Sequence, residues 1–267
     1  MFFQKIIKKC FIFIEQFVVG VWVFSAIVVC DSPYRHQTNF QDPATPGMEG
    51  ILLLHDFIWI FLLFILIFVS RLLFRIVILF EEGEQLRTDS TSKHTLLEAV
   101  WTITPGIILL FICGDSISQL YSSEEIFSSH LDVLIVGSQW FWTYEFVVFV
   151  KKVRVESHLI ELENLSMGEC RNLEVDCPLI LPVGATTRVL VTSTDVIHSW
   201  AVPSLGVKLD AVPGRINMGA LRLERAGRYY GQCSEICGKG HAGMPTVVVA
   251  TPPEIYNVYL FLLNAKN

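Results

Sequence analysis

The sequence predicts a membrane-anchored protein of the all-β class, in which a two-helix transmembrane hairpin precedes a β-sandwich or barrel. Two long apolar stretches in the first half, residues 51–80 and 96–113, predict the hairpin. From residue 130 onward the pattern changes to short runs of Val, Ile, Leu, Thr and aromatic residues separated by Gly, Pro and Asn, which is typical of repeated strands. The net charge of −6 and the lack of a basic cluster argue against a nucleic-acid partner.

The first fifty residues divide into two segments. Residues 1–30 begin with a basic group at 5–9 and continue as an apolar run that Glu15 and Gln16 interrupt. This pattern is typical of a leader, and a retained extra N-terminal anchor explains it equally well. Residues 31–50 are rich in Pro, Asp, Thr and Gly, which predicts a linker.

Residues 51–121 are predicted to form the transmembrane hairpin. The stretch from Phe57 to Ser70 carries no charge, and about 20 residues of helix suffice to cross the hydrocarbon core. Pro105 is compatible with the second span, because neighbouring helices and side chains satisfy the carbonyl that it leaves free. The short polar loop at 81–95 places the chain before and after the hairpin on the same side of the membrane.

Residues 122–252 have the length of one ordinary β-domain. The clearest predicted strands are Leu131–Val136, Phe141–Val150, Thr187–Val191 and Thr246–Ala250. The closing residues, 253–267, predict a C-terminal tail helix.

One short segment gathers residues that bind metals. Cys233 and Cys237 are four positions apart, His241 follows four positions later, and Met244 three after that. Glycines among them disfavour a continuous helix, so these side chains are expected on a loop between strands. His198 stands at the end of another strand-like run. Two Cys, two His and one Met form a soft-to-borderline set of metal ligands.

Spacing alone leaves several sites open. A disulfide between the two cysteines leaves the His and Met unexplained. A structural Cys2His2 zinc site uses four ligands and no thioether, and it remains a rival if Met244 is only a core residue. A blue copper site uses one Cys, two His and a weak Met, so one thiol is left over. Two thiolates that bridge a pair of copper ions use both thiols, one His for each copper, and Met244 with a backbone carbonyl as weak ligands.

The chain resembles subunit II of the haem–copper cytochrome c oxidases over nearly its full length from about Phe40. The resemblance rests on long and specific motifs, which include Gln139-Trp-Phe-Trp-Thr-Tyr-Glu145 and Tyr229-Tyr-Gly-Gln-Cys-Ser-Glu-Ile-Cys-Gly238. Further matching stretches lie at residues 40–46, 98–105, 173–176, 195–206 and 210–215. The resemblance implies a cupredoxin-like Greek-key β-domain after the hairpin.

The resemblance also implies a ligand set. Cys233 and Cys237 bridge the two coppers of the CuA centre, and His198 and His241 each bind one copper. Met244 binds through sulfur and Glu235 through its backbone oxygen. The Glu235 carboxylate is expected to reach a magnesium ion shared with the catalytic subunit, although a solvated loop acid is the simpler explanation without the family. No haem is expected in this chain.

Two more residues take roles from the resemblance. Trp140 is expected to be the point of electron entry from cytochrome c, whereas Trp142 is expected in the core, the commoner position for such aromatics. Glu98 occupies the position of a proton-uptake residue at the head of the second span. A carboxylate there also simply marks a helix end at the water interface.

Acidic residues near the copper loop receive the lysine-rich face of cytochrome c in this family. Glu145, Asp176 and Asp195 match such positions, and complementary charge raises the encounter rate. The chain departs from the family after Glu145, where an apolar run at 146–150 and two lysines replace the usual acids. The docking patch is therefore expected to be weaker or displaced, and the apolar run is expected to meet a neighbouring subunit.

The predicted function is that of an oxidase subunit, and thus part of an enzyme whose oxygen-reducing site lies in another chain. It accepts electrons from cytochrome c at CuA and passes them to haem in the catalytic subunit, which supports oxygen reduction and proton pumping. The expected partners are subunit I and the other oxidase subunits, cytochrome c and the lipid bilayer. The expected location is the mitochondrial inner membrane with the copper domain facing the intermembrane space, and a bacterial plasma membrane is the alternative. Rival functions are a metal-free assembly subunit, as in quinol oxidases, and a soluble dinuclear-copper reductase.

Overall fold

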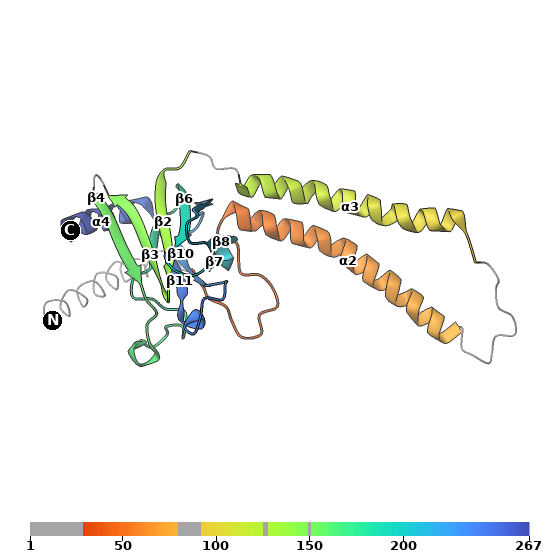
Figure 1. Ribbon diagram of the computed structural model, residues 1–267, viewed down its shortest axis with the longest axis horizontal. Coiled ribbons are helices and arrows are strands. Elements are labelled where there is room, and N and C mark those ends of the chain that lie inside the picture. The colour runs from red at the N-terminus through yellow and green to blue at the C-terminus, as the bar shows by residue number, and fades with distance from the viewer. Residues whose placement is uncertain (1–28, 80–91, 125–127, 149–150, 267) are drawn as a thin grey trace.

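The computed structural model describes residues 29–79, 92–124, 128–148 and 151–266. It consists of a long helical hairpin that projects from one side of a β-domain (Figure 1). The segment predicted to be a leader or anchor lies outside the described residues, apart from its last two positions.

Helices α2 (Pro46–Leu79) and α3 (Thr95–Glu124) form the hairpin. Both are long and apolar enough to cross a membrane. At about 1.5 Å per residue they measure about 50 and 45 Å, which exceeds the hydrocarbon core of about 30 Å. Both helices therefore extend beyond the apolar layer toward the β-domain.

The head of α2 is fixed to the β-domain. Thr45 caps the helix, because its hydroxyl oxygen accepts a hydrogen bond from the N–H of Met48 at 3.1 Å, and Pro46 occupies the first helical position. The same hydroxyl donates to the carbonyl of Leu205 at 2.8 Å. Because of this cap the helix begins within the stretch predicted as a linker. The hydroxyl thus connects the root of the hairpin to the chain that follows the His198 strand.

The β-domain places its strands in two layers (Figure 1). Within the described residues, one sheet has the strand order β1-β10-β11-β5, a second has the order β4-β3-β2-β6-β9, and β7 pairs with β8. The strands are β1 (Val29–Asp31), β2 (Leu131–Ser138), β3 (Phe141–Val148), β4 (Lys151–Ser157), β5 (Leu179–Pro182), β6 (Thr186–Ser193), β7 (His198–Val202), β8 (Val207–Ala211), β9 (Asn217–Arg222), β10 (Gly227–Gln232) and β11 (Pro245–Thr251). Strands that are far apart in sequence pair in parallel, as β2 does with β6 and β11 with β5, so the domain is not a simple meander.

Alternating burial along the strands builds one core between the sheets. Strand β6 alternates between half-buried and buried positions along its whole length, as expected for a strand with one face on the core. The largest fully buried side chains are aromatic and include Trp142, Trp200, Tyr144 and Tyr229. Cys233 and Cys237 belong to the same core cluster, so the predicted ligands lie at its edge and not on an isolated surface loop.

Two residues of the apolar run after Glu145 are covered by the chain itself. Phe146 and Val148 are buried, and Leu263 of the C-terminal helix α4 (Pro253–Lys266) belongs to the same cluster. Helix α4 packs against β3 and β5. The expectation that this run meets a neighbouring subunit is therefore wrong for these two residues, because strand alternation turns them inward and α4 helps to cover them. Val147 points outward and is exposed.

Candidate metal centre

The predicted ligands come from two places in the β-domain. His198 is the first residue of β7 and is fully buried. The loop from Cys233 to Met244 joins β10 to β11, and the antiparallel pairing of Gln232 with Pro245 closes its base. The N–H of Cys233 donates to the carbonyl of Met244 at 3.0 Å, which brings the first and last predicted ligands of the loop together.

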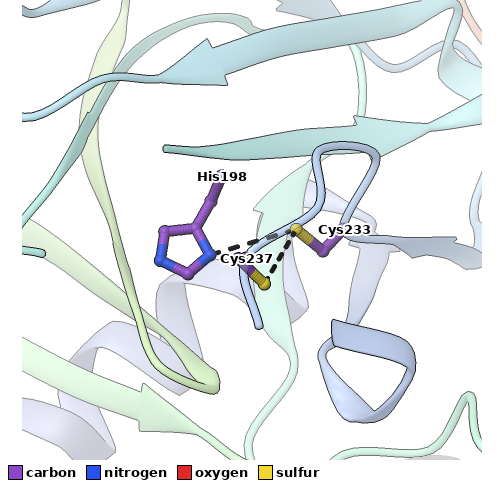
Figure 2. Close-up of side chains that lie close together, drawn as sticks. All are labelled: His198, Cys233 and Cys237. Atoms are coloured by element: carbon purple, nitrogen blue, oxygen red, sulfur yellow. Dashed lines mark hydrogen bonds between the residues drawn. The ribbon is translucent and has the colours of Figure 1, made fainter. Parts of the chain in front are cut away.

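The thiols lie between the two imidazoles. Cys233 Sγ is 4.0 Å from Cys237 Sγ and 4.0 Å from His198 Nδ1, as Figure 2 shows. On the other side, Cys237 Sγ is 3.6 Å from His241 Nδ1. The Cys233 thiol also approaches the backbone oxygen of Glu235 at 3.3 Å. Each sulfur therefore has one histidine of its own.

This arrangement fits two metal ions better than one. A single tetrahedral zinc ion, with bonds of about 2.0–2.3 Å, holds all four donors within about 4 Å of one another. In the described residues, the donor atoms that lie within 4.8 Å of one another are those of His198, Cys233 and Cys237, and His241 stands outside this group. Both cysteines are free thiols, which also removes the disulfide. Met244 is fully buried in the same core cluster as the two cysteines.

Burial keeps the metal-free thiol of Cys237 protonated. Burial, together with the neighbouring Cys233 thiol, raises the pKa of Cys237 to about 12. A metal that binds here must therefore displace a proton from the thiol, which couples its affinity to pH.

Asp195 fixes the orientation of His198. Its carboxylate lies 2.9 Å from His198 Nε2 and accepts backbone N–H groups from Gln139 and Val196, each at 2.7 Å. Burial alone raises the pKa of Asp195, but these hydrogen bonds outweigh it and hold the pKa below its usual range. With Nε2 held by the carboxylate, the other ring nitrogen, Nδ1, is the one that faces the thiols.

Trp140 lies against the ligand loop. Its indole N–H donates to the carbonyl of Cys237 at 3.3 Å, and the Gln139 side chain donates to the same carbonyl at 2.8 Å. The indole packs so closely on Gly240 that a side chain there would overlap the ring. The side chain is 39% exposed, whereas Trp142 is fully buried and its ring makes an edge-to-face type of contact with the ring of His198. Trp140 therefore reaches from the surface to the backbone of a predicted copper ligand.

Comparison with known proteins matches almost the whole chain to one family. The profile described as "Cytochrome C oxidase subunit II, transmembrane domain" matches residues 33–118, and the one described as "Cytochrome C oxidase subunit II, periplasmic domain" matches residues 131–251. The chain belongs to the cytochrome c oxidase subunit II family.

Cytochrome c oxidase subunit 2 of Cyanidium caldarium is 45% identical over 233 residues, covering 86% of this chain and 91% of that protein. The Arabidopsis thaliana protein is 43% identical over 248 residues, covering 91% and 95%. Among solved structures, the periplasmic domain of Bradyrhizobium japonicum subunit II is 34% identical, with a TM-score of 0.49, and covers 53% of this chain and 99% of that one.

Membership in the cytochrome c oxidase subunit II family confirms the predicted fold and the broad function. The protein is a membrane protein, and within the residues that the structure describes it has two transmembrane helices followed by a β-sandwich domain. It is the copper-binding, electron-transferring subunit of a terminal oxidase, and the cluster of His198 with the two cysteines agrees with a CuA site.

The remaining predicted residues are engaged within the chain. In the first turn of α3, the Glu98 carboxylate accepts the backbone N–H of His94 at 3.2 Å, so it caps this helix end. Glu145 forms an ion pair with Lys152 at 2.6 Å. Asp176 accepts the N–H of His158 at 2.8 Å. The functional roles predicted for these acids stay predictions.

Sequence reasoning missed two residues that support the site. Asp195 was assigned only a docking role, although an Asp three positions before a metal-binding His is a recognisable pattern for a ligand and its carboxylate partner. Gln139 was not singled out, and no local signal points to it. Its contact with the Cys237 carbonyl joins residues 98 positions apart.

Proposed function

We propose that this subunit binds two copper ions as a CuA centre through His198, Cys233, the backbone oxygen of Glu235, Cys237, His241 and Met244. The observation that carries the proposal is the pairing of each thiol with a different imidazole, His198 Nδ1 with Cys233 and His241 Nδ1 with Cys237. Soft thiolates and imidazoles are ligands that copper prefers. A metal-free assembly subunit would have no need of this buried set.

Two copper ions held by the two thiols and the two imidazoles would supply a site that gains and loses one electron with little rearrangement. The chain supports this in two ways. It buries the thiols in the core, which excludes water, and it holds the imidazole of His198 through Asp195. A rigid and dry ligand set reduces the reorganisation that accompanies each change of charge.

Trp140 is the proposed point of electron entry. Its exposed edge is available to a docking partner, and its indole N–H contacts the carbonyl of Cys237. One side chain therefore bridges the surface and a copper ligand. The proposed electron donor is cytochrome c, and the proposed acceptor is haem in the catalytic subunit.

The docking surface for cytochrome c is proposed to rely little on the three acids named above. Lys152 neutralises Glu145, and the carboxylates of Asp176 and Asp195 accept hydrogen bonds from this chain. The negative charge of these carboxylates is thus partly compensated within the chain before a partner binds. Association should therefore depend less on salt concentration than it does when a free acidic cluster steers a basic partner.

The finer assignments rest on the family resemblance. The exposed Glu235 side chain is proposed to reach a magnesium ion shared with subunit I, and Glu98 to take part in proton uptake. The proposed location is the mitochondrial inner membrane with the copper domain toward the intermembrane space. The proposed domain order is a linker, the transmembrane hairpin, the CuA domain and the tail helix, with the hairpin helices at Pro46–Leu79 and Thr95–Glu124 and the tail helix from Pro253.

Copper content together with the near-infrared spectrum tests the proposal. Two coppers per chain and a near-infrared band from a shared unpaired electron are expected, and Cys237→Ser should abolish the band. Cys177→Ser is the matched control, since the thiol of Cys177 forms no disulfide and lies outside the donor cluster. One zinc per chain without such a band, or a band that survives Cys237→Ser, would refute the proposal.

A further inference from the structure

The C-terminal helix α4 carries apolar side chains on two opposite faces. Tyr256 and Leu263 are buried against the β-domain. On the opposite side Val258, Phe261 and Leu262 are 55%, 65% and 39% exposed. Phe261 and Leu262 follow Val258 by three and four positions, so both lie next to Val258 on one side of the helix. A helix that is apolar on both faces is normally covered on both, so the outer stripe indicates a missing neighbour.

The bilayer does not provide this neighbour. Helix α4 lies on the side of the β-domain away from the hairpin (Figure 1). The membrane that contains α2 and α3 is therefore at the opposite end of the molecule.

The chain before Val29 arrives at the end of the sheet where α4 begins. The strand register places Val29 beside Gly227 in β10, and Gly227 beside Ala250 in β11. Two strand spacings of about 4.8 Å separate Val29 from Ala250, which makes about 10 Å. Strand β11 ends at Thr251 and α4 starts at Pro253. The segment that precedes Val29 therefore joins the described chain at the end of the sheet where α4 starts.

Strand β1 holds this starting point in place. Asp31, which is buried, forms an ion pair with Arg225. The guanidinium of Arg225 also donates to the carbonyls of Asp42 at 3.0 Å and Pro43 at 3.3 Å. A segment tethered this closely has a high effective concentration at α4, which favours an intramolecular contact over an external partner.

The composition of that segment matches an apolar surface. Between Cys10 and Val28, Glu15 is the single charged residue, and the rest includes four phenylalanines and one tryptophan. We propose that residues 10–28 cover the outer stripe of α4 formed by Val258, Phe261 and Leu262. The segment is then a retained part of the copper domain and acts neither as a removed leader nor as a third membrane anchor.

Photocrosslinking in the assembled oxidase tests the proposal. A benzophenone amino acid at position 261 of the full-length chain should form crosslinks to peptides from residues 10–28 on illumination. The same probe at the exposed Leu162, which lies on the loop between β4 and β5, is the control and should form no such crosslink. Crosslinks from position 261 to another subunit, to a second copy of this chain or to lipid, or no crosslink at all, would overturn the proposal.

The mass of the mature subunit gives a second and independent readout. The intact mass should include residues 10–28. A mature N-terminus beyond residue 28 would overturn the proposal without any variant, so a substitution that fails to fold does not leave it unresolved.

Discussion

Replacing Asp195 by Asn should weaken copper binding without unfolding the domain. The substitution preserves size but exchanges one carboxylate oxygen for an amide NH2 group. One oxygen of Asp195 faces both His198 Nε2 and the N–H of Val196, and the other accepts the N–H of Gln139. The amide oxygen of the substituted side chain is expected to keep the contacts with His198 Nε2 and with the N–H of Val196. The NH2 group then faces the N–H of Gln139, so two hydrogen-bond donors oppose each other.

The structure sets the size of the effect. Loss of one hydrogen bond to a charged acceptor costs about 1.5–3 kcal/mol. Weakening the partner of a metal-binding histidine typically lowers metal affinity by about 10–100-fold, which corresponds to about 1.4–2.7 kcal/mol. We therefore expect copper affinity to fall by one to two orders of magnitude in Asp195→Asn.

A chelator titration followed at the near-infrared band measures this affinity. Asp176→Asn is the matched control, because Asp176 also accepts a backbone N–H, but the residue that donates it, His158, is not a predicted ligand. An affinity within twofold of wild type in Asp195→Asn, or an equal loss in Asp176→Asn, would refute the reasoning.

Three further substitutions test electron entry, pH dependence and the attachment of the hairpin. Gly240→Ala should displace the Trp140 ring, since the added methyl group overlaps it. Reduction of the copper centre by cytochrome c, measured by stopped flow, should slow at least tenfold, and the copper content should stay unchanged. Asp132→Asn should cost about 0.2–1 kcal/mol at pH 7, because the Arg188 hydrogen bond outweighs burial and lowers the pKa of Asp132. For a lowered carboxyl pKa the stabilisation is complete above the usual value near 4 and disappears as pH falls through the folded value. Denaturant unfolding of the two proteins should therefore converge once the pH falls below the lowered pKa of Asp132. Thr45→Val removes the cap of α2 and the bond to the β-domain, and should lower the free energy of unfolding by about 1–2 kcal/mol and speed amide exchange at the head of α2.

Each of these has its own control. Gly47→Ala adds a methyl group where the nearest surrounding atom is 3.8 Å away, and it should leave the reduction rate unchanged. The double variant of Asp132 and Arg188 should lose less than the sum of the single losses, since the two side chains form one ion pair. Thr45→Ser keeps the hydroxyl and should behave as wild type. Equal effects of Thr45→Ser and Thr45→Val would contradict the role assigned to the hydroxyl.

The parts of this protein that follow from local pattern were predictable from the sequence. An uncharged stretch such as Phe57–Ser70 has few stable alternatives to a spanning helix, so the hairpin followed directly. Strand positions such as Leu131–Val136 followed from β-branched residues between turn residues. The predicted ligands Cys233 and Cys237 were visible because they share one loop. Helix ends were less predictable, because the start of α2 depends on a cap at Thr45 that also bonds to a distant carbonyl.

The fold class, the family and the set of candidate copper ligands can be predicted from the amino-acid sequence alone. Tertiary contacts set which thiol each imidazole faces, the contact of Asp195 with His198, and the pairing of Glu145 with Lys152. They also turn Phe146 and Val148 inward under α4. The reason is physical. A residue's own type and near neighbours set its preference for helix, strand or metal, whereas its partner is set by the register of strands that meet from distant parts of the chain.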